Sequence, residues 1–128
     1  MIFLRNCPVG QEYDQGSKKC IPEKFHWFGI DFNVGEAEEI IRQKPRKAKY
    51  FSMSKLIGTD AKVSERFLKK LTSKDCDRPG IVIQVDLYGE GVEPFLIDGH
   101  HRFAKCETLG RRKFLAYELT PEESNKVW

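Results

Sequence analysis

Runs of apolar residues, rather than single positions, mark the predicted strands of this chain. Residues 80–89, GIVIQVDLYG, form a continuous β-branched run, which is typical of a strand buried on both faces. Residues 92–99, VEPFLIDG, follow across a glycine-rich turn and predict the second arm of a hairpin. Residues 48–53 and the segment KFLAYEL at 113–119 also have strand composition. The pattern therefore predicts a sheet in the second half of the chain.

Helical spacing separates these strands. Residues 36–43 have helical composition, and this helix must end before Pro45 because proline disfavours the α conformation in the preceding residue. Residues 63–73 and 100–110 are also predicted as helices, and Thr120 is the expected cap of a short C-terminal helix. The expected packing positions of the two middle helices are Val63, Phe67, Leu68 and Leu71 in the first, and Phe103, Cys106 and Leu109 in the second, which ends at the capping residue Gly110.

The predicted order from residue 48 is β-α-β-β-α-β, a compact α+β unit with a small mixed sheet and two or three packed helices. We expect this unit to span residues 48–128. Residues 1–25 are polar and turn-rich and predict a short two-cysteine appendage. Residues 26–47 predict a helical lead-in, and its last part, with the PRKAK run at 45–49, is expected as a solvated basic connector.

Composition narrows the class of protein. Of the 128 residues, 40% are hydrophobic and 32% charged, which fits a folded globular domain. The formal charge of +3 does not demand nucleic acid as a partner but suits a ligand that carries phosphate. No run approaches the roughly 18 apolar residues of a membrane span, and the first residues are too polar for a signal peptide. We therefore expect a cytoplasmic protein, either in the cell that encodes it or in the cytoplasm of a host. Its four cysteines are then expected to be mostly reduced.

The first two cysteines, Cys7 and Cys20, leave three interpretations open. They can close a small disulfide hairpin, supply two zinc ligands with His26 as a third, or simply lie on an appended loop. The stretch CPVGQEYDQGSKKC also resembles a short two-cysteine motif, CPxGx…(T/S)x(K/R)C, appended to many viral and phage proteins. That resemblance suggests a phage- or virus-encoded protein.

The segment LIDGHHR carries the candidate chemistry. A buried strand ends at Ile97 and a helix begins about two residues later, with Asp98 as the expected cap and Gly99 as the residue that allows a sharp turn. The free N–H groups and the positive dipole end of the helix make such a junction an anion site. Arg102 adds a bidentate donor suited to phosphate.

Two adjacent histidines raise the alternative of a metal. His100 and His101 can donate to an anion when protonated or act as acid and base when neutral. Adjacent helical residues point about 100° apart, so the pair is poorly placed to ligate one ion. Asp98 with a nucleotide-bound Mg²⁺ is the favoured metal site, since magnesium is usually held by carboxylates and phosphates. The remaining alternative is that all four side chains are structural.

The stretch FLIDGHHRFAKCETLGRRKFLAYEL resembles the strand–helix–strand signature hhxDGhHRhxAxxxLG of the ParB/sulfiredoxin-like superfamily. The similarity covers about residues 48–119 and implies a nucleotide-binding α+β domain with the triphosphate at this loop and helix start. Sulfiredoxins have a catalytic cysteine where this chain has His100, and ParB-type partition proteins have a glutamate there. Cys106 lies on the predicted packing face and is a poor substitute for that cysteine, so sulfiredoxin chemistry is not favoured. The replacement of the glutamate by His100 argues in the same way against a DNA clamp.

The most similar branch, with DGHHR intact, includes free-serine kinases. That branch uses a carboxylate of a KL(x)PTE loop as a general base, and SKLIGTD stands at the matching place here. Asp60 would replace the family's glutamate and Gly58 its proline, and the shorter side chain retracts the base by about one methylene. Asp60 can equally serve as the N-cap of the following helix.

Three classes of function follow. The leading hypothesis is an ATP-dependent phosphotransferase or NTPase. In this hypothesis, the phosphates of ATP or another NTP with Mg²⁺ are bound by Gly99, His100, His101 and Arg102. Asp98 engages the metal or orients a histidine, and Asp60 activates a small hydroxyl acceptor or water. The second is a nucleotide- or anion-binding module without catalysis. The third, a DNA-binding or nuclease protein, has only scattered basic clusters to support it.

Overall fold

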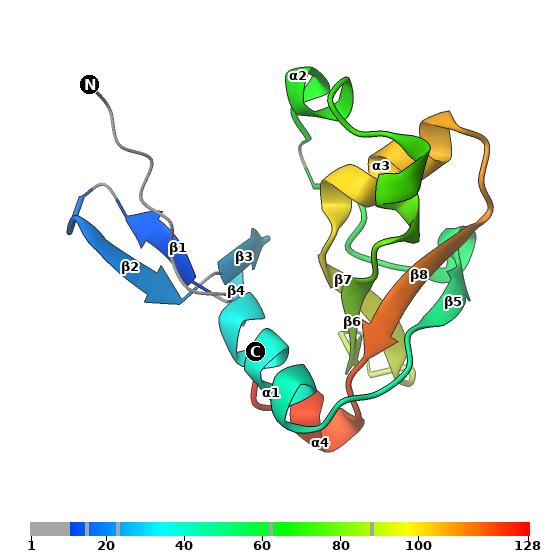
Figure 1. The fold of residues 1–128 in the computed structure, drawn as a ribbon. Helices are drawn as coiled ribbons and strands as arrows, with labels where there is room; N and C mark the ends of the chain where they lie inside the picture. The colour runs from blue at the N-terminus through cyan, green and yellow to red at the C-terminus, as the bar shows by residue number, and fades with distance from the viewer. Residues whose placement is uncertain (1–10, 15, 23, 62, 88) are drawn as a thin grey trace.

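A four-stranded mixed sheet forms the centre of the protein. The computed structural model describes residues 11–14, 16–22, 24–61, 63–87 and 89–128, and the following concerns these residues. The strand order is β5-β8-β6-β7, with β8 parallel to β6 and antiparallel to β5, and with β7 antiparallel to β6 (Figure 1). The strands span β5 (Lys49–Ser52), β6 (Gly80–Val85), β7 (Glu93–Asp98) and β8 (Lys113–Glu118). All four predicted strands and the α+β class are confirmed.

β6 is buried on both faces, as its continuous β-branched run predicts, and the apolar residues 95–97 of the edge strand β7 are buried as well. Alternating residues of these strands belong to two separate cores. Ile83 and Phe95 face a core completed by α1 (Val34–Gln43) and by the C-terminal Val127. The opposite core is completed by α3 (His100–Thr108) and contains Val82, Leu96, Phe103, Cys106, Phe114 and Ala116.

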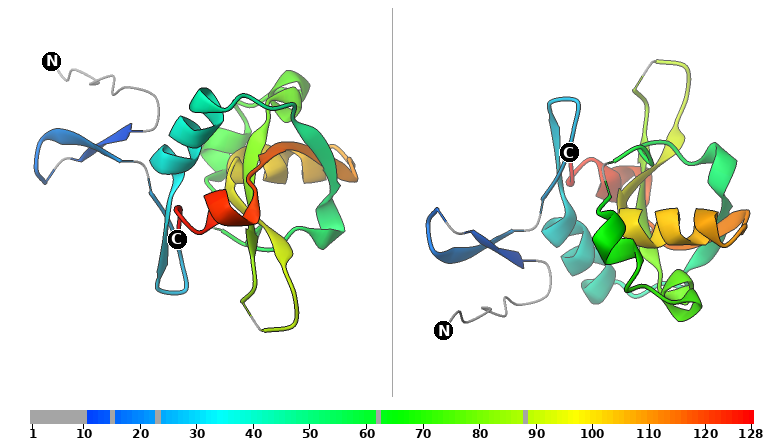
Figure 2. Two further views of the ribbon diagram at one scale, coloured as in Figure 1. Left: turned by 90° about the horizontal axis from the view of Figure 1, so that it is seen from below. Right: turned by 90° about the horizontal axis from the view of Figure 1, so that it is seen from above.

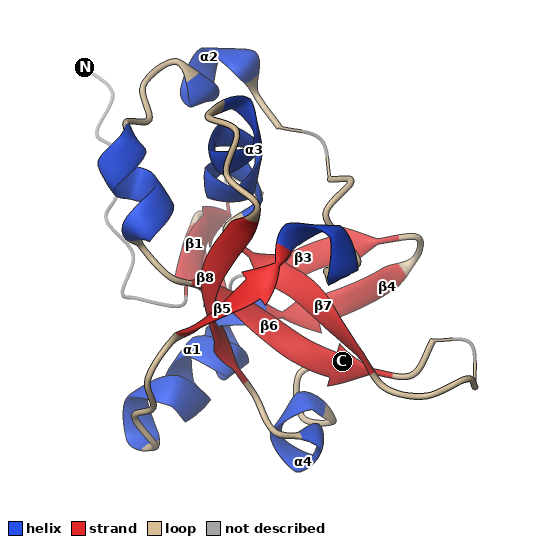
Figure 3. Ribbon diagram, turned by 90° about the vertical axis from the view of Figure 1, so that its right-hand side faces the viewer, coloured by secondary structure: helices blue, strands red, loops and turns tan. Residues whose placement is uncertain are grey.

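Helices cover the two faces of the sheet. α3 (His100–Thr108) and the four-residue α2 (Glu65–Leu68) lie on one side, while α1 and α4 (Pro121–Ser124) lie on the other (Figure 3). Two 3₁₀ turns complete the α3 side, η1 (Met53–Lys55) and η2 (Ser73–Asp77). α1 begins two residues before the predicted start at residue 36 and ends at the predicted residue. α4 has the predicted Thr120 cap and a capping box with Glu123.

Two hairpins precede the sheet. β3 (Lys24–Trp27) and β4 (Ile30–Asn33) pair antiparallel, and Phe32 of β4 is fully buried in the core that contains Phe95. Residues 26–47, expected as a lead-in, therefore share the core of the sheet. β1 (Gln11–Asp14) and β2 (Lys19–Pro22) form the other hairpin, which lies to one side of the molecule (Figure 2).

The cysteines differ in state. Cys20, on β2, is disulfide-bonded, so the expectation of mostly reduced cysteines does not hold for this residue. Its candidate partner, Cys7, lies outside the described residues. Cys76 and Cys106 are buried free thiols, and burial together with the nearby Cys76 thiol raises the pKa of Cys106 to about 12. A buried thiol held protonated is a packing group rather than a nucleophile.

Two predicted helical faces are wrong in part. The helix expected over 63–73 is only α2, followed by a turn and η2, and Phe67 of its predicted packing face is 47% exposed. In α3, Phe103 and Cys106 are buried as predicted, but Leu109 is exposed because the helix ends at Thr108 and Gly110 turns away at φ +76°.

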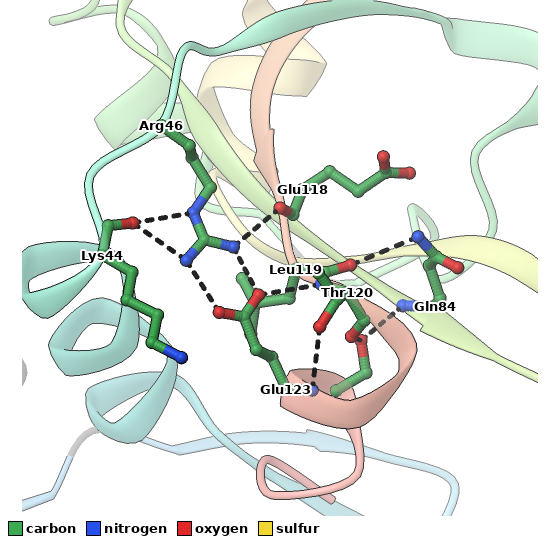
Figure 4. Close-up of polar contacts among 8 residues, drawn as sticks. Lys44, Arg46, Gln84, Glu118, Leu119, Thr120 and Glu123 are labelled. Atoms are coloured by element: carbon green, nitrogen blue, oxygen red, sulfur yellow. Dashed lines mark hydrogen bonds and ion pairs between the residues drawn. The ribbon is translucent and has the colours of Figure 1, made fainter.

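The connector at 45–49 is not simply solvated. The guanidinium of Arg46 donates to both carboxylate oxygens of Glu123 in α4 and to the carbonyl of Glu118 in β8 (Figure 4). It also donates to the carbonyl of Lys44. Arg46 thus ties the end of α1 to β8 and α4.

No helix of the described residues is long and apolar enough to cross a membrane.

A candidate anion site at the start of helix α3

The junction between β7 and α3 turns at Gly99. This glycine is the N-cap of α3 and has a left-handed backbone conformation, with φ +99°. A side chain here would place Cβ 3.2 Å from the Gly80 Cα and 3.3 Å from Arg102 Nη2, so the turn requires glycine. No side chain caps the helix, and the expectation that Asp98 does so is wrong.

Asp98 instead pairs with Arg102. Its Oδ2 lies 3.3 Å from Arg102 Nη2, one helical turn along. Arg102 Nη1 donates to the carbonyls of Pro79, at 2.8 Å, and Arg78, at 3.2 Å. The guanidinium is largely buried, and through these three contacts it holds the segment before β6 against the start of α3. Arg102 is therefore fixed at the β7–α3 junction, where the sequence predicts a hydrogen-bond donor to phosphate.

His100 is held away from a donor role toward a ligand. Its Nε2 donates to the Gly58 carbonyl at 2.9 Å, and its ring stacks on Phe25 with centroids 4.2 Å apart. Burial lowers the pKa of His100, although the Gly58 carbonyl and the charge of Asp98 act in the opposite direction. The neutral imidazole thus fastens α3 to the loop after η1 and to β3.

His101 points toward α2. The Ser64 N–H donates to His101 Nε2 at 3.2 Å, and Phe67 meets the imidazole edge-on with centroids 4.7 Å apart. The two neighbouring histidines therefore have different partners on different elements. No cluster of three or more potential metal ligands occurs among the described residues.

Asp60 lies on the loop that passes β3. Its Oδ1 accepts a hydrogen bond from Trp27 Nε1 at 3.1 Å, and the residue is exposed. Its neighbour Ala61 lines a pocket at the start of α3, whereas Asp60 does not line this pocket. Nor does Asp60 cap α2, because the Oγ of Ser64 accepts from the Phe67 N–H. The capping interpretation of Asp60 is wrong.

The start of α3 opens onto a pocket of about 390 Å³, which we call the α3 pocket. Residues 97–102 form part of its wall, so Asp98, Gly99, both histidines and Arg102 are brought together as expected. The remaining lining residues come from distant segments and are Lys24, Phe25, Val34, Ala61, Phe67, Leu71 and Arg78.

Two cations of the α3 pocket were not found by sequence reasoning. Lys24 begins β3, and Arg78 follows η2 with a side chain that is 66% exposed and 3.3 Å from Asp75. They join Arg102 on the wall, against the single carboxylate of Asp98. With the uncapped amides and positive dipole end of α3, this arrangement can bind an anion.

Acid should destabilise the fold through His100. Because its pKa is lowered in the folded state, the unfolded chain binds the proton more readily, and the free energy of unfolding should fall as the pH drops below about 6.5. The variant His100→Phe keeps an aromatic ring against Phe25 but cannot take up a proton. Its urea-unfolding curves between pH 7.5 and 5.5 should show a weaker pH dependence than the wild type, whatever its absolute stability. An equal slope in both proteins would contradict the buried neutral imidazole.

Comparison with known proteins does not assign the chain to a family. A scan against models of protein families finds none that matches, and a search of curated proteins finds no matching sequence.

Proposed function

We propose that this protein binds the phosphate groups of a nucleoside triphosphate in the α3 pocket and acts as an ATP-dependent phosphotransferase or NTPase. The observation that carries the proposal is the first turn of α3, which has no side-chain cap and lines the same pocket as Lys24, Arg78 and Arg102. Uncapped N–H groups need acceptors, and phosphate oxygens supply them together with a charge that the dipole favours.

The Mg²⁺ expected with the nucleotide would be held by Asp98. This carboxylate is half-buried, lines the α3 pocket and is oriented by Arg102 at 3.3 Å. Magnesium takes one or two protein carboxylates together with substrate phosphates, so one aspartate beside a phosphate site is a suitable donor set. When bound, the ion would neutralise charge on the phosphates.

The second candidate is a nucleotide-binding module without turnover, and the position of Asp60 favours it. The proposed general base must reach an acceptor hydroxyl, yet its carboxylate is held by Trp27 and does not line the pocket. His100 is likewise occupied by the Gly58 carbonyl. Measurement of phosphate release separates the two candidates.

We further propose a ParB/sulfiredoxin-like fold for residues 48–128. The order β5, α2, β6, β7, α3, β8 and the position of the DGHHR segment between β7 and α3 support the assignment. The hairpins and α1 before residue 48 lie outside the sequence resemblance.

Calorimetric titration tests the binding proposal. The wild type should bind ATP with Mg²⁺. Arg78→Ala should weaken binding about tenfold, because a hydrogen bond to a charged group contributes about 1.5–3 kcal/mol and a side chain that is 66% exposed contributes at the lower end of this range. The matched control is Arg112→Ala, which removes an exposed arginine that does not line the α3 pocket. Absence of binding to ATP, GTP and CTP would contradict the proposal.

Turnover should depend on the first turn of α3. In a phosphate-release assay, His101→Ala and Arg102→Ala should each abolish hydrolysis or transfer from ATP, because both residues line the α3 pocket. Circular dichroism checks that each variant remains folded. Tight ATP binding by the wild type with no phosphate release, tested with water and with small hydroxyl acceptors, would favour the second candidate.

A further inference from the structure

Phe67 is an exposed aromatic ring on the wall of the α3 pocket. It is 47% exposed, although a large apolar side chain on a predicted packing face would normally be buried. The reason is local: α2 is only four residues long, and none of them is buried. Phe67 therefore contributes little to either core, and its free surface faces solvent in a pocket that also contains cations.

The position of Phe67 is tied to the start of α3. His101, in the first turn of that helix, contacts the Phe67 ring edge-on at 4.7 Å and accepts from the Ser64 N–H. Ser64 in turn caps the helix that carries Phe67, through its Oγ and the Phe67 N–H at 3.3 Å. The ring is thereby fixed next to the turn where phosphates would bind.

We propose that Phe67 is the stacking platform for the nucleobase of the bound nucleotide, an inference that rests on the proposed nucleotide function. The same pocket places cations and uncapped amides, which suit phosphates, beside an aromatic ring and the apolar Leu71, which suit a planar base. An inorganic polyphosphate would leave this ring uncovered. The ligand class is therefore a nucleoside phosphate rather than phosphate alone.

The stacking interaction also sets the specificity. Every nucleobase presents a π-face, so stacking on Phe67 tolerates different bases, whereas hydrogen bonds to base edges would discriminate between them. ATP, GTP and CTP should therefore bind within a few-fold of one another. Stacking of a base on an aromatic side chain is worth enough to make each of them bind about tenfold more tightly than inorganic triphosphate.

Titration of ATP and of inorganic triphosphate, each with Mg²⁺, into the wild type and Phe67→Ala tests the inference. Phe67→Ala should lose about tenfold in affinity for ATP and should bind inorganic triphosphate as the wild type does. Phe67→Tyr, which retains the ring, should keep the preference for ATP. Tyr50→Ala is the matched control, because Tyr50 is 61% exposed on β5 and does not line the α3 pocket.

The outcomes separate the inference from the proposed function. If ATP binds the wild type and Phe67→Ala equally well, stacking on Phe67 is wrong and the phosphate site stands. If the wild type binds inorganic triphosphate as tightly as ATP, the base is not recognised and the inference is also wrong. If neither compound binds, the proposed function itself fails and the inference with it. Thermal unfolding of each variant shows whether a loss of binding reflects a loss of fold.

Discussion

Replacing Arg46 by alanine should lower the free energy of unfolding by about 3–5 kcal/mol, the usual loss when one partner of a buried ion pair is removed. Arg46 and Glu123 are 18% and 11% exposed, and the guanidinium contacts both carboxylate oxygens. The alanine variant leaves the Glu123 carboxylate in a poorly solvated position at the start of α4. It also leaves the Glu118 carbonyl without the donor that Arg46 provides.

Urea unfolding at pH 7 measures the effect, with Arg42→Ala as the matched control. Arg42 pairs with Glu39 on the exposed face of α1, where the two side chains are 71% and 40% exposed. Because exposed pairs contribute at most about 1 kcal/mol, the control should lose far less stability. A loss below 1 kcal/mol in Arg46→Ala, or an equal loss in both variants, would contradict the structural role of this pair.

The Arg46–Glu123 pair also predicts a loss of stability in acid, but at lower pH than for His100 and for a different reason. Hydrogen bonds from Arg46 lower the pKa of Glu123 from 4.5 to about 2, with the Thr120 N–H adding to the shift. Because the folded pKa is the lower one, this stabilisation is complete above pH 4.5 and is lost as the pH falls toward 2. The difference between the unfolded and folded pKa of Glu123 corresponds to about 3 kcal/mol in the free energy of unfolding. Glu123→Gln should therefore be less stable than the wild type at pH 7 and should approach it near pH 2.

Replacing Phe95 by alanine should cost about 3–5 kcal/mol, because a buried ring is lost and a cavity remains. Phe95 is fully buried on β7, and its ring centroid lies 4.8 Å from that of Phe32 and 5.0 Å from that of Trp27. It also packs against Gly58, where an added Cβ would come within 2.5 Å of the Phe95 ring. The ring therefore holds the β3–β4 hairpin and the loop after η1 against the sheet.

The matched control for Phe95 is Phe28→Ala, at the turn of the same hairpin. Phe28 is 80% exposed, and its removal should change the free energy of unfolding by no more than about 0.5 kcal/mol. Thermal or urea unfolding at pH 7 compares the two variants. Similar losses in both would mean that the aromatic cluster does not stabilise the fold as its burial indicates.

The sheet could be predicted from sequence because its strands are continuous apolar runs bounded by turn residues. The helix over 63–73 could not, because its apolar spacing is helical while tertiary packing ends α2 at Leu68 and leaves Phe67 in a pocket wall. The PRKAK pattern predicts a solvated connector because nothing in it indicates that Glu123, 77 residues later, lies beside Arg46. Long-range partners of charged residues leave no local signal.

The candidate site was predicted in part for the same reason. The local turn at Gly99 follows from strand, glycine and helix signals, and its positive φ agrees. The spacing could not show that Asp98 pairs with Arg102 instead of capping the helix. Lys24 and Arg78 come from distant segments, and only the packing of β3 and η2 around α3 brings them to the pocket.

The most direct test of the phosphate site is an amide-resolved NMR titration of the wild-type protein with ATP and Mg²⁺. If phosphates bind the uncapped first turn of α3, the backbone N–H signals of His100, His101 and Arg102 should shift most, and Arg78→Ala should require about tenfold more ATP for the same shifts. If the largest shifts fall instead on the basic segment Arg111–Lys113, or no amide shifts at millimolar ATP, the α3 pocket is not a nucleotide phosphate site.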